Sequence, residues 1–214
     1  MSAPIPKNDS TRLKVLWQYD VLDTVPEEVF DDLADLAAHI CETPIALISL
    51  VDENRQWFKS RIGTTVKETS RDISFCAHAI LSDGLLVVPD TTKDARFKHN
   101  PLVTGPQKIR FYAGAPLLTP DGHALGTLCV LDKKPRHLRP EQKQALVVLA
   151  HHVVSQLELR RHARELVRAR KKDEQQRAEL ARAREENIHL RQELIQYHAR
   201  VRSAKSPVGK SARR

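Results

Sequence analysis

Hydrophobic residues recur every three or four positions in one stretch near the N-terminus. This spacing, between Thr24 and Pro44, predicts an amphipathic helix that packs one face on a core. Thr24 and Glu27 have the spacing of a capping box, so we expect the helix to begin there. The predicted apolar face consists of Val29, Leu33, Leu36, Ala37 and Ile40.

Four other stretches have the short apolar runs that are typical of strands. Residues 45–51 are almost continuously apolar, as expected of a strand covered on both faces, and residues 56–62 follow after a polar turn. Residues 111–118 and 124–131 flank a Pro-Asp-Gly turn and predict a second hairpin. Shorter elements are predicted as helices at 13–19 and 73–81 and as a strand at 85–88, whereas 64–72 is predicted to be irregular. Strands joined by hairpins, with helices around them, predict an α/β (α+β) domain on an antiparallel sheet.

The C-terminal third has the pattern of one long helix. From about Pro140 to about Arg202 neither Pro nor Gly interrupts a run of good helix formers, which predicts a rod of roughly 90 Å. A heptad repeat gives it an apolar seam at both ends, with Asp173 and Gln176 in its polar middle. We predict dimer contacts at the seam residues Leu159, Leu166, Leu180, Asn187, Leu190 and Leu194.

The charges beside this seam favour a parallel homodimer. Four of the five g positions from 165 to 193 are Glu, and four of the five e positions from 170 to 198 are Arg. In a parallel pair each g faces an e of the partner, so only Lys172 and Arg177 would repel. An antiparallel pair would place like charges together. The alternative is a solitary helix with a solvated, salt-bridged surface.

Composition and charge limit the class of protein. The 214 residues are 41% hydrophobic, enough for one domain plus an appendage. No segment resembles a signal peptide and no apolar run reaches the length of a membrane span, so we expect a cytoplasmic protein without membrane contact. The net charge of +8 lies in the C-terminal part, where residues 159–214 hold 17 Lys and Arg against 7 Asp and Glu. Cys41, Cys76 and Cys129 are too far apart to indicate a disulfide framework or a metal site.

Several motifs resemble a known family in the right order. Residues 113–117 and 126–132, Ala-Gly-Ala-Pro-Leu and Gly-Thr-Leu-Cys-Val-Leu-Asp, are similar to the final hairpin of GAF domains. Residues 45–52 and 55–60 resemble the first hairpin of GAF domains in bacterial sensor kinases and diguanylate cyclases, and residues 71–78 resemble the same subset. The resemblance covers roughly residues 12–158. It implies a small-molecule-sensing or dimerising domain with five or six antiparallel strands, whose first and last helices form a dimer bundle continuing as a signalling helix.

The resemblance and the helix together divide the chain into four parts. We predict a disordered N-terminus at 1–10, a GAF domain at 11–158, a parallel coiled coil at 159–202 that continues the last domain helix, and a disordered basic tail at 203–214. The Asn-Lys-Phe signature of cyclic-nucleotide-binding members is not present, and no cysteine occurs between Asp90 and Tyr112, where bilin-binding members carry theirs. Cyclic nucleotide and covalent bilin are therefore disfavoured as cofactors, and the ligand stays unknown.

The long polar stretch at 91–110 is the expected position of a site, because loops of this length in compact domains are usually functional. The predicted ligand-binding residues are cationic and aromatic groups that suit a small anion or an aromatic molecule: Phe75, Cys76, His78, Arg110 and Tyr112. A sealed domain without ligand is the alternative. Cys76 and His78 could form a redox or metal-binding pair, but on a helix positions i and i+2 do not share a face, which favours a structural role.

The basic C-terminal part is a candidate nucleic-acid interface. It lacks interleaved aromatic residues, and its arginines are largely assigned to the seam, so nucleic-acid binding is not expected. A relaxed phosphate-loop match at 204–211 lacks the strand and helix that such a loop requires.

The sequence thus predicts a non-enzymatic, stand-alone GAF signalling protein with no catalytic or metal residues. We expect it to form a parallel homodimer and to relay small-molecule or redox state to a separate signalling protein, such as a kinase or a cyclase. Two alternatives stay open, a constitutive scaffold without ligand and a nucleic-acid-associated protein.

Overall fold

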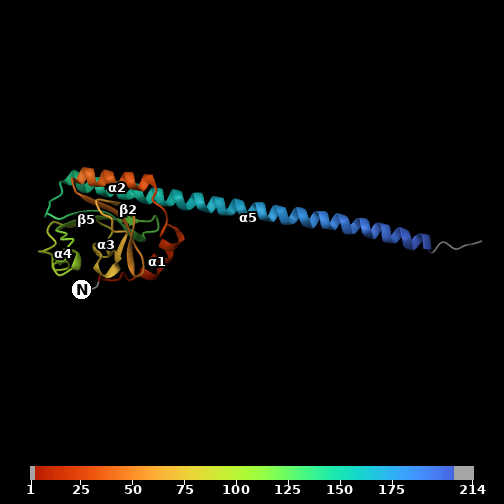
Figure 1. Ribbon diagram of the computed structural model, residues 1–214, viewed down its shortest axis with the longest axis horizontal. Helices are drawn as coiled ribbons and strands as arrows, with labels where there is room; N and C mark the ends of the chain where they lie inside the picture. Colours follow the sequence, from red (N-terminus) through yellow and green to blue (C-terminus); the bar gives the residue numbers. More distant parts are fainter. Residues whose placement is uncertain (1–2, 205–214) are drawn as a thin grey trace, which may run out of the picture. The chain divides into compact units, whose positions relative to one another are not determined.

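The computed structural model describes residues 3–204 (Figure 1). The chain divides into two units, and the division falls after His162, near the domain boundary expected at position 158. The first unit contains a sheet with flanking helices, which is the predicted α+β fold. Among the described residues, no helix is both long enough and apolar enough to cross a membrane.

A six-stranded antiparallel sheet forms the centre of the first unit. Its order is β3-β2-β1-β6-β5-β4, so the two predicted hairpins lie side by side and β1 pairs with β6 in the middle. The strand predicted at 85–88 is present, and a short strand, β3, pairs with β2 in the stretch predicted to be irregular. The strands are β1 (Ile45–Val51), β2 (Arg55–Ile62), β3 (Glu68–Ser70), β4 (Leu86–Val88), β5 (Phe111–Leu118) and β6 (Ala124–Asp132).

Within residues 3–204, five α-helices and one 3-10 helix surround or follow the sheet. The helix predicted at 73–81 is shorter, because Ser74 is its N-cap and accepts a hydrogen bond from the backbone N–H of Ala77. The stretch at 91–110 contains one turn of helix, capped by Asn100. The helices are α1 (Asp9–Gln18), α2 (Glu28–Cys41), η1 (Arg71–Ile73), α3 (Phe75–Ala79), α4 (Pro101–Thr104) and α5 (Pro140–Ala204).

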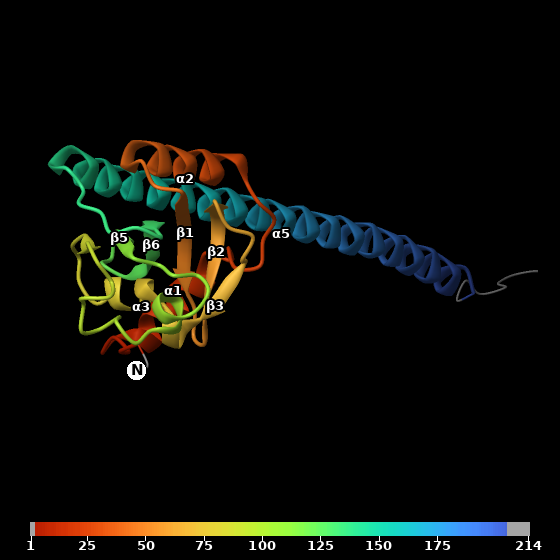
Figure 2. The ribbon, with the colours of Figure 1, turned by 60° about the vertical axis from the view of Figure 1, so that its left-hand side comes forward.

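The sheet has a buried core on each face. Alternate residues of a strand point to opposite faces, so Ile48 and Leu128 face one core while Leu47 and Cys129 face the other. The first core is covered by α2 and the first part of α5, which run alongside each other in both ribbon views (Figures 1 and 2). The second core lies beneath α3, α4 and the loops around them. The central strands β1, β5 and β6 contribute residues to both cores.

The predicted capping box does not form. Helix α2 begins at Glu28, and its N-cap, Glu27, makes no side-chain capping bond. Thr24 and Glu27 instead accept hydrogen bonds from the ammonium of Lys59 on β2, at 3.0 and 2.6 Å. The Lys59 side chain is fully buried. A buried ammonium must be paired, and this requirement prevails over local capping.

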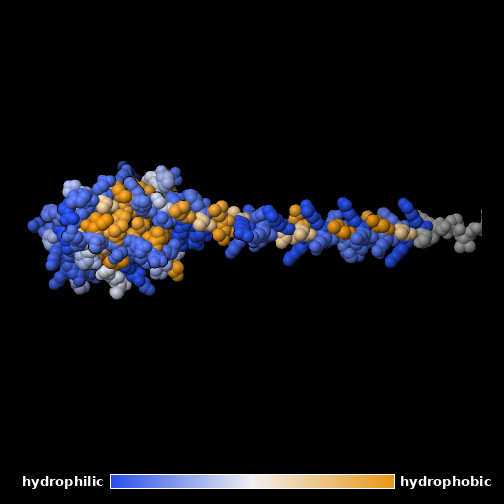
Figure 3. Space-filling view, turned by 90° about the horizontal axis from the view of Figure 1, so that it is seen from above, coloured by the Kyte–Doolittle hydropathy of each residue, from blue (hydrophilic) through white to orange (hydrophobic). Residues whose placement is uncertain are grey.

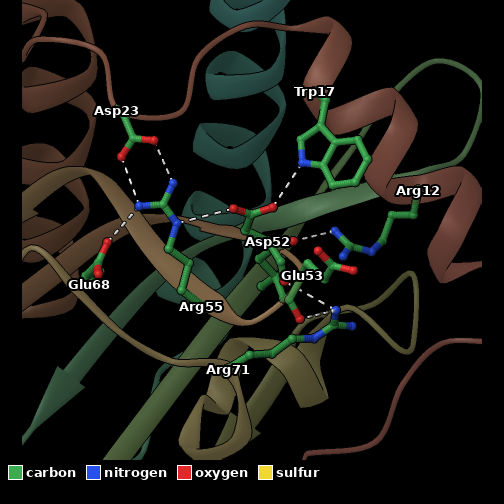
Figure 4. Close-up of polar contacts among 9 residues, drawn as sticks. Arg12, Trp17, Asp23, Asp52, Glu53, Arg55, Glu68 and Arg71 are labelled. Atoms are coloured by element: carbon green, nitrogen blue, oxygen red, sulfur yellow. Dashed lines mark hydrogen bonds and ion pairs between the residues drawn. The ribbon is translucent and has the colours of Figure 1, made fainter.

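A network of ion pairs connects α1 to the turn between β1 and β2 (Figure 4). The Asp9 carboxylate receives hydrogen bonds from Arg12 and from Arg71, at 2.7 to 2.9 Å. Trp17 donates its indole N–H to Asp52, which also accepts from Arg55. Residues 3–10, where disorder was predicted, therefore include the start of a helix with a buried carboxylate.

The second unit consists of the continuation of α5. Its apolar seam residues are exposed in the single chain, with exposed fractions from 54% at Leu180 and Leu194 to 72% at Leu166. Arg170 and Arg177, two of the e positions, form ion pairs along the same helix with Glu174 and Asp173. The coiled-coil dimer stays a prediction. Most of the predicted basic tail, and nearly all of the phosphate-loop match, lie beyond Ala204 and so outside the described residues.

Candidate functional site

A cavity of about 200 Å³ lies between the second face of the sheet and the segments that cover it. The sheet contributes its floor, because alternate residues of β1, β2, β5 and β6 point to this side. The floor residues are Ile45, Leu47, Gln56, Phe58, Tyr112, Cys129 and Leu131. Most of this surface is apolar, as in most small-molecule sites.

Two loops and two short helices complete the walls. Phe75 and Cys76 come from α3, and Leu102 comes from α4. The loop after β2 turns at Gly63, whose φ of +73° favours glycine, and a Cβ there would lie 1.8 Å from the carbonyl oxygen of Pro44. This turn directs Thr64 and Val66 to the cavity.

A few polar groups border the apolar surface. Gln56 accepts a hydrogen bond from the Ser74 hydroxyl, which fixes its amide. The buried Thr69 hydroxyl has no partner among the described residues, and the exposed Lys133 lies at the edge of the lining. An unpartnered hydroxyl and a cation can orient a ligand that carries an acceptor or an anionic group.

Three of the five predicted site residues meet in this cavity. The rings of Phe75 and Tyr112 stack with their centroids 5.3 Å apart. The Tyr112 hydroxyl donates a hydrogen bond to Cys76 Sγ at 3.4 Å. Burial raises the pKa of Tyr112, so this phenol keeps its proton and remains a donor.

The other two predicted residues lie outside the lining. His78 packs edge-on against Phe97, with ring centroids 4.7 Å apart, and its pKa is lowered by burial and by the charge of Arg96. Arg110 donates to the backbone carbonyls of Val103 and Ile109. Both residues therefore stabilise the 91–110 segment that covers the cavity, because one packs on its aromatic residue and the other holds its backbone.

Cys129 lines the cavity but was not among the predicted site residues. Its Sγ lies 3.7 Å from Cys76 Sγ, and both thiols are free and buried. The two cysteines are 53 positions apart, on α3 and β6, so no local spacing could reveal the pair. Among residues 3–204, no cluster of His, Cys, Asp or Glu is arranged to hold a metal ion.

A polar chain leads from the sheet to α5 on the opposite face. Lys59 pairs with Glu27, and Glu27 also accepts a hydrogen bond from Arg160 at 2.9 Å. The Tyr19 hydroxyl donates a hydrogen bond to Glu158, which precedes the start of the second unit at Ala163 by five residues. Phe58 on β2 lines the cavity, and its neighbour Lys59 forms the ion pair with Glu27, so β2 connects the cavity with the polar contacts to α5.

The chain is similar to known proteins in sequence and in fold. The model of the GAF domain family matches residues 25–157. A cyclic di-GMP phosphodiesterase of Pseudomonas aeruginosa is 44% identical over 144 residues, which are 67% of this chain and 24% of that protein. The chain thus spans about a quarter of the length of this relative.

Solved structures share the fold at low sequence identity. The GAF domain of PixJ from Thermosynechococcus elongatus, in its blue-light absorbing form, has a TM-score of 0.55 at 14% identity, over 74% of this chain and 94% of that one. The GAF domain of a phosphoenolpyruvate-protein phosphotransferase from Acinetobacter has a TM-score of 0.53 at 16% identity, over 72% and 95%. The GAF region of a membrane protein from Geobacter sulfurreducens has a TM-score of 0.51 at 22% identity, over 70% of this chain and 97% of that one.

Proposed function

Because the chain belongs to the GAF domain family, a family of sensory domains in signalling proteins, we propose that its cavity binds a small molecule and that binding is relayed along α5. The observation that carries this proposal is the partly enclosed, mainly apolar cavity bordered by Gln56, Thr69 and Lys133. A compact aromatic or aliphatic molecule with one acceptor or anionic group fits these surroundings. The described lining includes neither carboxylate nor histidine that could act as a general acid or base.

A thermal-shift screen of small metabolites against the full chain tests ligand binding. A ligand that binds only the native state raises the melting temperature, and the shift grows with the logarithm of the ratio of ligand concentration to dissociation constant. Leu102→Trp should abolish the shift, because the larger side chain fills the cavity from α4. Leu81→Trp, at an exposed position outside the lining, is the matched control and should keep the shift. A library in which nothing raises the melting temperature would favour the scaffold alternative.

We further propose that the receiving element is a parallel homodimer formed by α5. The exposed seam residues need a partner, and apolar side chains also gather over α2 and the first part of α5 (Figure 3). The exposed residues of this domain face include Val29, Leu36 and Val148. A second copy could cover both surfaces, since a parallel pair brings the same faces together.

The relay then follows the contacts of β2. A ligand beside Phe58 displaces β2, and Lys59 carries this displacement through Glu27 to Arg160 on α5. Two packing states of paired helices would provide the bistable element that such a relay needs. The recipient would be a separate signalling protein such as a kinase, a cyclase or a cyclic di-GMP enzyme, the last being the class of the Pseudomonas relative.

Amide hydrogen exchange separates the sensor from a scaffold. The ligand found in the screen should change protection in residues 163–202, and Lys59→Met should remove this change while the thermal shift remains. Glu53→Gln is a suitable control, because this exposed side chain is outside the Lys59 chain. Unchanged protection in the wild-type protein with bound ligand would contradict the relay.

A further inference from the structure

Cys76 and Cys129 form a pair of thiols at the floor of the cavity. Their sulfur atoms are 3.7 Å apart, and both residues contribute to the lining. The side chains are at most 2% exposed to bulk solvent. Any reagent small enough to enter the cavity therefore meets two sulfur atoms at once.

We propose that Cys76 and Cys129 are an oxidisable dithiol, which a small hydroperoxide entering the cavity converts to an intramolecular disulfide. The inference rests on the cavity of the proposed function for access, and it requires neither the unidentified ligand nor the dimer. It assigns the redox partner of Cys76 to Cys129 and not to His78.

The geometry allows the bond to form with a small movement. A disulfide places its sulfur atoms at about 2.0 Å, so the two atoms must approach by somewhat less than 2 Å. Cys129 lies in the central strand β6 and is held firmly by its neighbours. Cys76 lies on α3, a helix of five residues, which can shift more readily.

The surroundings make Cys76 the first thiol to react. Burial alone would raise its pKa, but the neighbouring donor groups of Cys129, Thr127, Tyr112 and Ser49 prevail and lower the pKa below that of a free thiol. Among the described residues, the hydroxyls of Ser49 and Thr127 have no hydrogen-bond partner, and a thiolate would supply their acceptor. Burial and the neighbouring sulfur raise the pKa of Cys129, which suits the second, resolving thiol.

The reaction balances with the hydroperoxide as oxidant. The Cys76 thiolate attacks one peroxide oxygen, the O–O bond breaks, and the alkoxide leaves as an alcohol, or as water from hydrogen peroxide, after taking a proton. Cys129 then attacks the sulfenic sulfur, the S–S bond forms, and the S–O bond breaks with release of water. Two electrons pass from the two sulfur atoms to the peroxide. A cellular or added dithiol returns them by exchange.

Oxidation would alter the same cavity that the proposed ligand occupies. The new bond would draw α3 towards β6, and Phe75 is adjacent to Cys76 on that helix. Since Phe75 and both cysteines belong to the lining, the reduced and oxidised forms offer different cavities. We expect any ligand identified in the screen to shift the melting temperature of the two forms unequally.

The test is mass spectrometry of the full-length chain after a short pulse of hydrogen peroxide. The wild-type protein should lose about 2 Da, yield a crosslinked Cys76–Cys129 peptide, and regain its mass with dithiothreitol. Cys129→Ser should instead gain about 16 Da at Cys76 or trap a sulfenic-acid probe there. Cys76→Ser should stay unmodified at Cys129. Cys41→Ser, at the buried cysteine of α2, is the matched control and should crosslink at the wild-type rate.

The pH profile of the crosslinking rate tests the assigned roles. The rate should rise about tenfold per pH unit below the lowered pKa of Cys76 and level off before the pH range in which a free thiol titrates, because only the thiolate attacks. Tyr112→Phe removes one donor and should move the plateau to higher pH. A rate that rises steadily to pH 9 in the wild-type protein would contradict an activated Cys76.

Three outcomes would overturn the proposal. They are an unmodified wild-type protein, a gain of about 32 Da at Cys76 without crosslink, and a crosslink through Cys41 or between chains. The mass loss and the crosslinked peptide are measured on the wild-type protein, so the test stays valid even where a variant fails to fold. If the disulfide forms but no ligand raises the melting temperature, the dithiol is supported and the sensory proposal is contradicted. If a ligand raises the melting temperature but no disulfide forms, the sensory proposal is supported and the dithiol is contradicted.

Discussion

At the scale of single residues, the Asp9 carboxylate lies between two buried guanidinium groups. It accepts hydrogen bonds from Arg12 and Arg71, whose side chains are 1% and 7% exposed. Without the carboxylate two like charges would remain close together in a buried site. The network also holds α1 against the turn at Asp52 and Glu53, because Arg71 donates to both of their carbonyl groups (Figure 4).

Asp9→Asn should lower the free energy of unfolding by about 3 kcal/mol at neutral pH, since breaking one partner of a buried ion pair leaves an uncompensated charge. Urea denaturation followed by tryptophan fluorescence measures this change, because both tryptophans, Trp17 and Trp57, lie in the first unit. Asp83→Asn, in an exposed loop, should change the free energy by less than about 0.5 kcal/mol.

Asp9→Asn should also change how the free energy of unfolding falls at acidic pH. Burial raises the pKa of Asp9, but the bonds from Arg71 and Arg12 prevail and hold it below its ordinary value of 3.8. The stabilisation is therefore complete above pH 3.8 and is lost as the pH falls through the lower pKa of the folded state. The difference between wild type and Asp9→Asn should shrink in that range. A constant difference down to about pH 2 would contradict this reasoning.

At the scale of secondary-structure elements, the close approach of β1 and β6 decides how the sheet is built. Gly126 on β6 lies opposite Leu50 on β1, and a Cβ at Gly126 would lie 1.8 Å from the carbonyl oxygen of Ser49. The contact is with backbone, so no side chain can move aside. Both strands carry floor residues of the cavity, such as Leu47 and Cys129.

Gly126→Ala should destabilise the protein by about 2 kcal/mol or more, because an overpacked central strand pair must separate. The same urea titration measures it, and the cavity ligand should bind more weakly if the floor is displaced. Gly84→Ala is the matched control, since nothing lies within 4 Å of the added carbon. Equal stability of the two variants would contradict the close approach of the strands.

At the scale of the whole molecule, the open question is whether two chains pair along α5. Arg184 is an exposed e position, and in a parallel dimer it would face Glu179 of the partner. Each exposed pair contributes only a few tenths of a kcal/mol, and a dimer contains two copies of it. The charge pattern therefore sets orientation and partner choice more than strength.

Arg184→Glu should weaken the dimer about fivefold in dissociation constant, because both copies of the pair become repulsive. Adding Glu179→Arg restores opposite charges in a parallel dimer and should recover the wild-type constant. Sedimentation equilibrium measures all three proteins. A wild-type chain that stays monomeric at micromolar concentration, or a double variant that pairs no better than the single one, would contradict the parallel dimer.

The sequence by itself determined the local elements. The pattern of apolar residues predicted α2 and the four long strands, and an uninterrupted run of helix formers predicted α5, because backbone conformation is set within a few residues. Motifs along the chain were sufficient to identify the GAF resemblance. The same local reasoning brought Phe75, Cys76 and Tyr112 to one site, because each lies near the expected loop or strand.

Only the tertiary structure decided which distant residues meet. Thr24 and Glu27 pair with Lys59 and not with the start of α2, because a buried ammonium requires acceptors from wherever the fold can supply them. Cys129 lies beside Cys76 because α3 packs on β6, and no pattern within either segment encodes that contact. Local sequence fixes the conformation of a segment, whereas the neighbours of a side chain depend on how the whole chain buries its apolar faces.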